Sequence, residues 1–421
     1  MRPIQQRLSK SFFALLSLPS TAMGFALSVQ ISALSWILST QYQLDIHEVG
    51  IVWAAGPLAG IVGQVVIGMI SDKSWFWGGR RRPFIWIGGT MASLSLLALP
   101  YLGAISESTS VSILAVALPV ALLLDLSINI SFNPTRSIIA DVTPEGDKRT
   151  RGYTWMQTIS GMFGVLAYAI GAISGNYTLI YFSVFLVFIF SILPPLFIEE
   201  PRDLESSSVE SNASHKSSYG DLYRIYAAHG FCWIGVQTMF VYMIFYVKDT
   251  MGITSGEQSG QIVSISFLVL STVGFIFPAS VLEPLAKKIG RVRVHTLSMV
   301  CMALGYLLIV LAGTTPLLVY IFMGIAGIGW AATVSLPFAI MTEKVDKTKM
   351  GFFMGIFNLS VVLPQLLVSL VLGGIIQQAA NKSIIFIISA GTLAISAILW
   401  TFVREETISK DAPTPASSSS H

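Results

Sequence analysis

The sequence predicts an all-α membrane protein with twelve transmembrane helices in two six-helix pseudo-repeats. Three observations support this prediction: the composition, the spacing of apolar runs and the distribution of basic residues. Of the 421 residues, 53% are hydrophobic and only 11% are charged, whereas a soluble domain averages about 25% charged residues. A chain this apolar requires an apolar solvent, so we expect the lipid bilayer to surround it.

The apolar runs have the length of membrane-spanning helices, which need about 20 mostly apolar residues. Because the runs lack the alternation of barrel strands, helices are the expected spanning form. The predicted spans cover residues 12–40, 48–70, 83–104, 110–135, 152–173, 177–198, 222–247, 259–282, 294–313, 316–340, 350–377 and 383–403.

The basic residues orient these spans, because cytoplasmic connections carry an excess of Lys and Arg. With the N-terminus in the cytoplasm, 22 of the 25 basic residues lie in cytoplasmic segments. Only Lys248 and Lys382 fall outside, and Arg136 lies at the inner end of the fourth span. The reverse orientation would invert this bias. We therefore expect a multi-pass protein of the cell (inner) membrane with both termini cytoplasmic.

The predicted domains follow from a polar stretch in the middle of the chain. We expect an N-terminal six-helix bundle over 1–198, a Ser-rich cytoplasmic linker over 199–221, a C-terminal six-helix bundle over 222–403 and a disordered tail over 404–421. The formal charge of +3 indicates no nucleic-acid partner. The two cysteines, Cys232 and Cys301, lie in apolar runs and predict no metal site. We expect a functional monomer.

No sequence feature predicts an enzyme. The chain contains no Walker A sequence, no His-Glu-x-x-His motif and no nucleophile elbow. We therefore expect neither ATP-driven pumping nor hydrolysis, and no cofactor apart from a coupling ion.

The stretch "GMISDKSWFWGGRRRP" after the second span concentrates charge in one short connection. Asp72 lies seven residues before Gly79, and "EPLAKKIGRVR" after the eighth span repeats this spacing from Glu283 to Gly290. The pattern resembles the cytoplasmic loop motif of the major facilitator superfamily, with "SWFW" as extra residues. The resemblance implies a cytoplasmic gate in which the acid pairs with bases or a helix N-terminus. The alternative is that the basic cluster serves topology alone. The gate candidates here are Asp72, Arg80, Arg81, Glu283 and Arg291.

The fourth span carries charge into the apolar region, where one charge costs at least about 2.5–3.5 kcal/mol. Asp125 and Arg136 are 11 residues apart, which at about 100° per residue places them about 20° apart around a helix. Asn129 and Asn133 fall on the same side, so the four residues form one polar stripe that cannot face lipid. A carboxyl group whose surroundings change between conformations can bind and release a proton, which makes Asp125 the candidate proton carrier. The alternative is a structural hydrogen bond between helices.

Other spans supply amide and aromatic side chains, which suit hydroxyl-rich, neutral sugars. The alternatives are interhelical hydrogen bonds for the amides and an interface belt for the tryptophans. Glycines 56, 60 and 63 in the second span predict close helix packing. Asn176 and Thr178 form a glycosylation acceptor pattern in an expected outer loop. The candidate sugar contacts are Gln30, Asn129, Gln157, Trp233, Gln237, Trp330 and Asn358.

Two motifs give the chain a more specific resemblance. "GQVVIGMISDK…GGRRRPFI" and "LLLDLSINISFNPTRSIIAD" resemble motifs of plant sucrose transporters and animal proton-coupled sugar transporters, within the glycoside-pentoside-hexuronide:cation symporter group. Ile128, Asn133 and Thr135 depart from the family pattern. The motifs cover about residues 24–170, and the second half is similar only in layout. The matching positions are Asp125, Asn129, Pro134, Arg136 and Asp141.

The resemblance implies a major facilitator fold with a central cavity, and proton-coupled symport of a sucrose- or maltose-type glucoside by alternating access. Asp125 would accept the proton, Arg136 would be its charged partner, and Asp141 would join the cytoplasmic gate. The expected partners are the sugar, protons and the bilayer. One alternative is a Na⁺-coupled melibiose-type carrier, which would present more acids within its spans. The other is a transport-inactive sugar sensor, which would carry a longer loop or tail.

Overall fold

The computed structural model describes the chain apart from residues 1–4, 6–7, 145, 202–218, 346–349 and 405–421. The side chains of residues 62, 64–69, 72, 73 and 350–352 are also outside the described part. Within the described part there is no β-sheet, only an isolated bridge between Phe76 and Gly79. The all-α prediction is therefore confirmed.

The first group of helices follows the predicted spans closely. The first span bends through a π-helical segment, and the third passes through one 3₁₀ turn. The elements are α2 (Lys10–Val29), η1 (Gln30–Leu34), α3 (Ser35–Thr40), α4 (Ile46–Trp53), α5 (Ala55–Lys73), α6 (Arg82–Ala98), η2 (Leu99–Tyr101), α7 (Leu102–Thr109), α8 (Ile113–Val142) and α9 (Asp147–Leu196).

The second group contains three further π-helical segments. The elements are α10 (Tyr219–Phe245), η3 (Tyr246–Thr250), α11 (Gly256–Phe277), η4 (Pro278–Leu282), α12 (Glu283–Ile289), α13 (Arg291–Ala312), α14 (Pro316–Glu343), α15 (Met350–Leu367), η6 (Val368–Leu372), α16 (Gly373–Gln378) and α17 (Ile384–Thr401).

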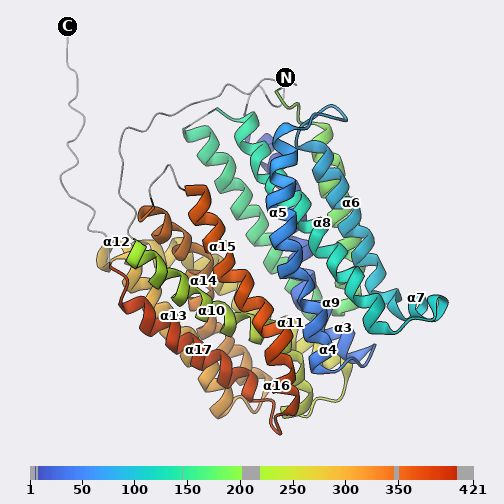
Figure 1. The fold of residues 1–421 in the computed structure, drawn as a ribbon, viewed down its shortest axis with the longest axis vertical. Coiled ribbons are helices and arrows are strands. Elements are labelled where there is room, and N and C mark those ends of the chain that lie inside the picture. Colours follow the sequence, from blue (N-terminus) through green and yellow to red (C-terminus); the bar gives the residue numbers. More distant parts are fainter. Residues whose placement is uncertain (1–4, 6–7, 145, 202–218, 346–349, 405–421) are drawn as a thin grey trace.

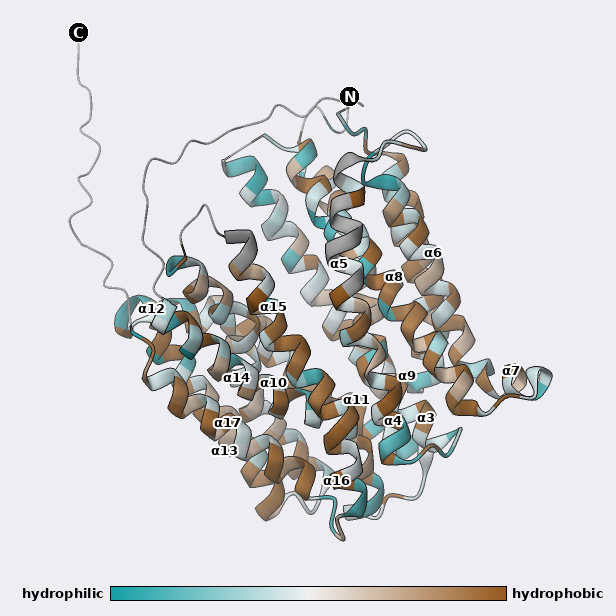
Figure 2. Cartoon of the chain, in the orientation of Figure 1, coloured by the Kyte–Doolittle hydropathy of each residue, from teal (hydrophilic) through white to brown (hydrophobic). Residues whose placement is uncertain are grey.

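Ten helical stretches of the described chain are long and apolar enough to cross a membrane. The longest, α9, is two helices joined at Gly175, whose φ of 82° is non-helical and favours glycine. Gly175 lies between the predicted fifth and sixth spans. The predicted second span corresponds to α4 and α5, which are separated only by Ala54. The total of twelve crossings remains a prediction. Figure 2 shows apolar residues along most of the length of these helices.

Several helices begin where the sequence supplies a capping side chain. Asp45 and Glu48 form a reciprocal capping box at the start of α4. Ser112 caps α8 and Ser255 caps α11 by accepting a backbone N–H. These caps satisfy N–H groups that the helix itself leaves without partners.

The helices pack into two groups that follow chain order (Figure 1). In the first, α2 packs on α9, and α6 packs on α8 and α9. In the second, α10 packs on α17, and α14 packs on α11 and α13. The pairing of α9 with α11 joins the two groups. The division at 199–221 remains a prediction, because most of this linker lies outside the described residues.

Several described polar contacts between the groups lie at the end opposite the start of α2 and the end of α17. The Nζ of Lys248 donates to the carbonyl of Ser39 at 2.9 Å. The side chain of Gln377 donates to Asp45 at 3.1 Å and accepts from the backbone N–H of His47 at 2.9 Å. At the opposite end, the ion pairs that we describe join residues of the same group.

Candidate functional site

Asp125 lies in α8 with only 7% of its surface exposed. Its Oδ2 accepts a hydrogen bond from the Nε2 of Gln30 at 2.9 Å. Gln30 is itself 1% exposed and begins the π-helical segment η1, a local irregularity that is frequent at functional sites. The predicted first span thus brings Gln30, a candidate sugar contact, to Asp125, the candidate proton carrier, and sequence spacing did not reveal this contact.

Glycines of α5 bring its backbone close to this part of α8. A Cβ atom at Gly56 would lie 3.2 Å from the Oδ1 of Asp125, and one at Gly63 would lie 3.0 Å from the Cβ of Asn129. At Gly60 nothing lies within 4 Å of that position. The predicted close packing is therefore confirmed at Gly56 and Gly63 and is wrong at Gly60, which faces open space.

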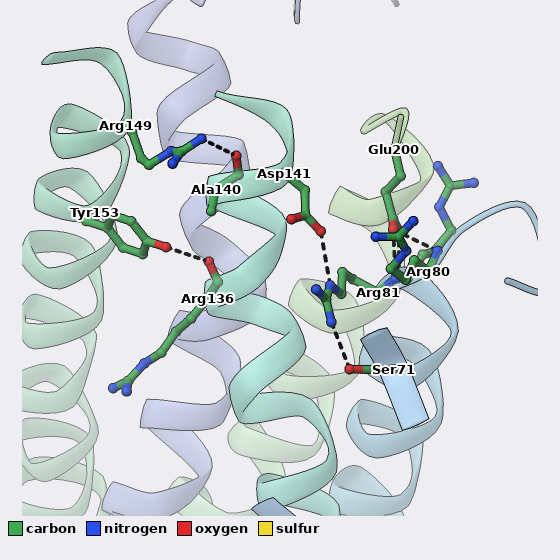
Figure 3. A network of polar contacts seen from close by, with 10 residues as sticks. Ser71, Arg80, Arg81, Arg136, Ala140, Asp141, Arg149, Tyr153 and Glu200 are labelled. Atoms are coloured by element: carbon green, nitrogen blue, oxygen red, sulfur yellow. Dashed lines mark hydrogen bonds and ion pairs between the residues drawn. The ribbon is translucent and has the colours of Figure 1, made fainter. Parts of the chain in front are cut away.

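Arg136 lies on α8 toward the end nearer the linker, and it is exposed. Its guanidinium lies 4.0 Å from the centre of the Phe132 ring, a cation–π contact. Its carbonyl accepts from the hydroxyl of Tyr153 at 3.2 Å, while its side chain points away from Asp141 (Figure 3). Asp125 and Arg136, both described, form no ion pair with each other. Asn129, one turn after Asp125, donates to the carbonyl of Asp125 at 2.8 Å.

The second group of helices brings the sugar candidates Trp233 and Trp330 into contact, and a third candidate, Gln237, follows Trp233 by four residues on α10. Trp233 and Trp330 meet edge to face with centroids 6.3 Å apart, and Phe240 meets Trp330 at 5.2 Å. The indole N–H of Trp233 donates to the Nε2 of His229 at 3.0 Å. Gln365 donates to the Oε1 of Gln237 at 3.3 Å.

Two sugar candidates lie apart from these clusters. Gln157 is exposed on α9, and Asn358 is half-buried in α15. No contact that we describe joins either residue to the Asp125 or the Trp233 cluster. Their predicted role therefore rests on residue type alone.

The predicted cytoplasmic gate contains an ion pair between Arg81, which immediately precedes α6, and Asp141 of α8. The Nε of Arg81 donates to the Oδ2 of Asp141 at 3.0 Å, and the same guanidinium donates to Ser71 at 2.9 Å (Figure 3). Both ionic side chains are largely buried. The side chain of Asp72, the acid that the loop motif singles out, lies outside the described residues.

Glu200 is a residue of this cluster that the sequence prediction missed. Its carboxylate accepts the backbone N–H groups of Arg80, Arg81 and Arg82 at 2.7, 2.7 and 2.8 Å. A carboxylate at this position satisfies orphan donors at the start of α6 and opposes the positive end of the helix dipole. The sequence shows an acid just after the predicted sixth span, but no motif or spacing predicts that it contacts Arg80, Arg81 or Arg82.

The second group contains a related ion pair. Arg291, the first residue of α13, pairs with Glu343, the last residue of α14. Arg81 immediately precedes α6, and Asp141 lies in the last turn of α8. Both pairs therefore join the start of one helix to the end of the next spanning helix. Glu283, expected beside Arg291, pairs with Lys287 of its own helix at 2.7 Å.

A comparison with known sequence families identifies this architecture. The profile of the Major Facilitator Superfamily matches residues 16–369 and 272–420. The chain belongs to the major facilitator superfamily. It is a multi-pass integral membrane transporter and not an enzyme.

The curated relatives of this superfamily member include several sucrose carriers. Sucrose transport protein SUT2 of Oryza sativa subsp. indica is 26% identical over 83% of this chain and 85% of its own length. Sucrose transport protein SUC4 of Arabidopsis thaliana is 26% identical over 87% and 84% of the two chains. The general alpha-glucoside permease of Schizosaccharomyces pombe is 28% identical over 37% of this chain and 31% of its own.

Solved structures of the superfamily share the fold at low sequence identity. A mutant of the nucleoside transporter NupG superposes with a TM-score of 0.74 and 13% identity, covering 93% of this chain and 99% of that one. The xylose transporter XylE from E. coli superposes with a TM-score of 0.69 and 14% identity, covering 95% and 97%. These superpositions confirm the predicted major facilitator fold.

Proposed function

We propose that this major facilitator protein is a proton-coupled symporter of a sucrose- or maltose-type glucoside that works by alternating access. The observation that carries the proposal is the buried carboxyl group of Asp125, held by Gln30 within a spanning helix. The sugar assignment is supported by the relatives, which are sucrose transport proteins and an alpha-glucoside permease.

The environment of Asp125 supports the proposed proton coupling. A buried carboxylate without a countercharge is costly, whereas a protonated carboxyl tolerates burial. Asp125 is buried here beside a neutral amide and without an ion pair. When the cavity opens and water reaches it, the proton can leave. One proton moving through 100 mV releases about 2.3 kcal/mol, which supports about fifty-fold accumulation of sugar.

The sugar would lie between the Asp125 cluster and the Trp233 cluster. Gln30 and Asn129 supply amides on one side, and Gln237 supplies an amide beside Trp233 and Trp330 on the other. Aromatic faces suit the C–H surfaces of a sugar ring, and amides match its hydroxyl groups. Gln157 and Asn358 complete the proposed lining, and Arg136 would act as the charged partner on the same face of α8.

We place the linker and both termini in the cytoplasm, as the basic residues predict. Thiol labelling of single cysteines at Ser108 and Ser208 tests this proposal. Ser108 is exposed in α7, whereas Ser208 lies outside the described residues. Ser108→Cys should react only from outside and Ser208→Cys only from inside. The opposite pattern would reject the orientation.

The decisive experiment is uptake of a labelled disaccharide panel into proteoliposomes under an imposed pH gradient, comparing wild type with Asp125→Asn. The amide keeps the size of the carboxyl but cannot release a proton. Driven accumulation should disappear, while sugar-for-sugar exchange continues, because exchange needs no net proton movement.

Asp249→Asn provides a matched control, because Asp249 is an exposed acid in η3, away from the proposed coupling site. This control should accumulate sugar like the wild type. Replacing Na⁺ by K⁺ should not change sugar accumulation by either the wild type or the control. If Asp125→Asn still accumulates sugar with the wild-type pH dependence, the proton is carried by another residue. If accumulation requires Na⁺, the carrier is of the Na⁺-coupled type.

A further inference from the structure

A pocket of about 300 Å³ lies at the end of the molecule opposite the start of α2 and the end of α17. Its walls come from both helix groups. Trp36 and Thr40 of α3 line one side, Asn176 and Tyr177 beside the break in α9 line another, and Gly256 and Glu257 at the start of α11 close it. The pocket therefore exists in this form only while the two groups are closed together at this end.

The closure around the pocket is made by specific contacts. The indole N–H of Trp36 donates to the carbonyl of Gly256 at 2.7 Å. The Oδ1 of Asn176 accepts from Ser264 at 3.0 Å and from Ser32 at 3.4 Å. These bonds tie the first span and α9 to α11, so the floor of the pocket is also the closed barrier at this end.

The pocket offers the groups that recognise a hydroxyl-rich ligand. Asn176 borders the pocket but is only 3% exposed, and its Nδ2 atom is buried against Gly260, where an added Cβ atom would lie 2.8 Å from it. Trp36 and Tyr177 meet edge to face at 5.2 Å and give the pocket aromatic surfaces. Glu257, an exposed carboxylate, adds a hydrogen-bond acceptor.

Burial also overturns the glycosylation pattern at Asn176. An acceptor asparagine must present its Nδ2 to solvent. Here that atom is buried below the pocket, so the pattern at Asn176 and Thr178 does not mark a glycan site.

We propose that this pocket is a second binding site for the transported glucoside, occupied by one sugar ring and formed only when this end is closed. The volume is at the small end of the range of ligand pockets, about 300–1,000 Å³, which suits a single ring. This proposal rests on the proposed function for the ligand and on the orientation for calling this end the outer one.

The position of the pocket predicts its effect on transport. A sugar bound between the two groups stabilises their contact and must leave before they separate at this end. High external sugar therefore holds the carrier closed to the outside and slows uptake. The expected kinetic signature is an uptake rate that rises with external sugar, passes through a maximum and then falls.

The experiment combines equilibrium binding of a labelled glucoside to purified protein with uptake into proteoliposomes. Tyr177→Leu removes an aromatic wall, and Glu257→Gln removes the carboxylate. The matched controls are Tyr181→Leu, one helical turn further along α9, and Glu107→Gln, an exposed acid in α7; neither position lines the pocket.

Wild type and both controls should bind two sugars per chain and show the fall in rate at high external sugar. Tyr177→Leu and Glu257→Gln should bind one and lose the fall. One sugar per chain in the wild type, unaffected by the pocket variants, would overturn the second site and leave the proposed function standing. If the wild type accumulates no sugar but binds glucoside, and the pocket variants lose this binding, the proposed function is overturned and the binding site stands. No binding of any glucoside would overturn the site as well.

Discussion

Gly56 brings the backbone of α5 close to the carboxyl group of Asp125. We expect Gly56→Ala to impair proton-driven uptake, because the added methyl would lie 3.2 Å from the Oδ1 of Asp125 and would displace the carboxyl group from Gln30. Loss of one such buried hydrogen bond corresponds to about 0.5–1.5 kcal/mol. The measurement is the initial rate of uptake as a function of pH.

Gly60→Ala is the matched control, because it makes the same change on the same helix where nothing lies within 4 Å. It should transport like the wild type. Equal effects of the two substitutions would mean that helix propensity, and not contact with Asp125, is responsible.

Arg136 tests whether a positive charge alone is sufficient on this face of α8. Arg136→Lys keeps the charge but loses the planar guanidinium that stacks on Phe132. We expect uptake to fall, because the flexible ammonium does not hold one position over the ring. The measurement is the rate of sugar-induced proton uptake into liposomes.

Phe132→Leu provides the comparison for the arginine substitution, because it removes the ring and keeps the guanidinium. Both variants should be impaired if the stacked geometry matters. Normal proton uptake by Arg136→Lys would show that the charge alone serves the mechanism.

At the scale of helices, the beginning of α6 depends on a residue from beyond the end of α9. Glu200→Gln should destabilise the protein, because one amide oxygen cannot replace two charged oxygens that accept three backbone N–H groups. Charge-assisted hydrogen bonds of this kind contribute about 1.5–3 kcal/mol. The measurement is the apparent melting temperature in detergent, which should fall.

Glu107→Gln, the same change at an exposed position in α7, should leave the melting temperature unchanged. Glu200→Asp keeps the charge on a shorter side chain and should lie between the wild type and Glu200→Gln. A melting temperature of Glu200→Gln equal to that of the wild type would show that α6 begins without this cap.

For the whole molecule, alternating access requires that the closed end can open. Thr40 and Gly256 face each other across the two helix groups, and a Cβ atom at Gly256 would lie 3.3 Å from the Cβ of Thr40. This separation is close to the approximately 3.5–4.5 Å of disulfides. We expect oxidised Thr40→Cys/Gly256→Cys to stop uptake and reduction to restore it.

The two single-cysteine variants are the controls for the cross-link, and neither should respond to oxidant. Uptake at the wild-type rate by the fully cross-linked protein would mean that this end does not open during transport.

Sequence alone determined the membrane class and the helical fold, and it predicted that Asp125 is enclosed by helices. Each of these depends on properties of a single segment. An apolar run of sufficient length must span as a helix because its backbone groups find no water in lipid, and a charge within such a run is costly wherever the helix lies. The predicted spans 152–173 and 177–198 left only three residues for the turn between them. The break in α9 lies within those residues, at Gly175, where φ is positive.

Tertiary structure decided which side chains meet. Gln30 contacts Asp125, and Glu200 caps α6. Glu283 forms an ion pair with Lys287 of its own helix. Asn176 is buried, although its sequence pattern suggested an exposed loop. The physical reason is that periodicity fixes the face of a helix on which a residue lies, whereas its partner depends on how neighbouring helices are rotated and how closely they approach. Here that approach is set by pairs such as Gly56 with Asp125, whose closeness no single segment reveals.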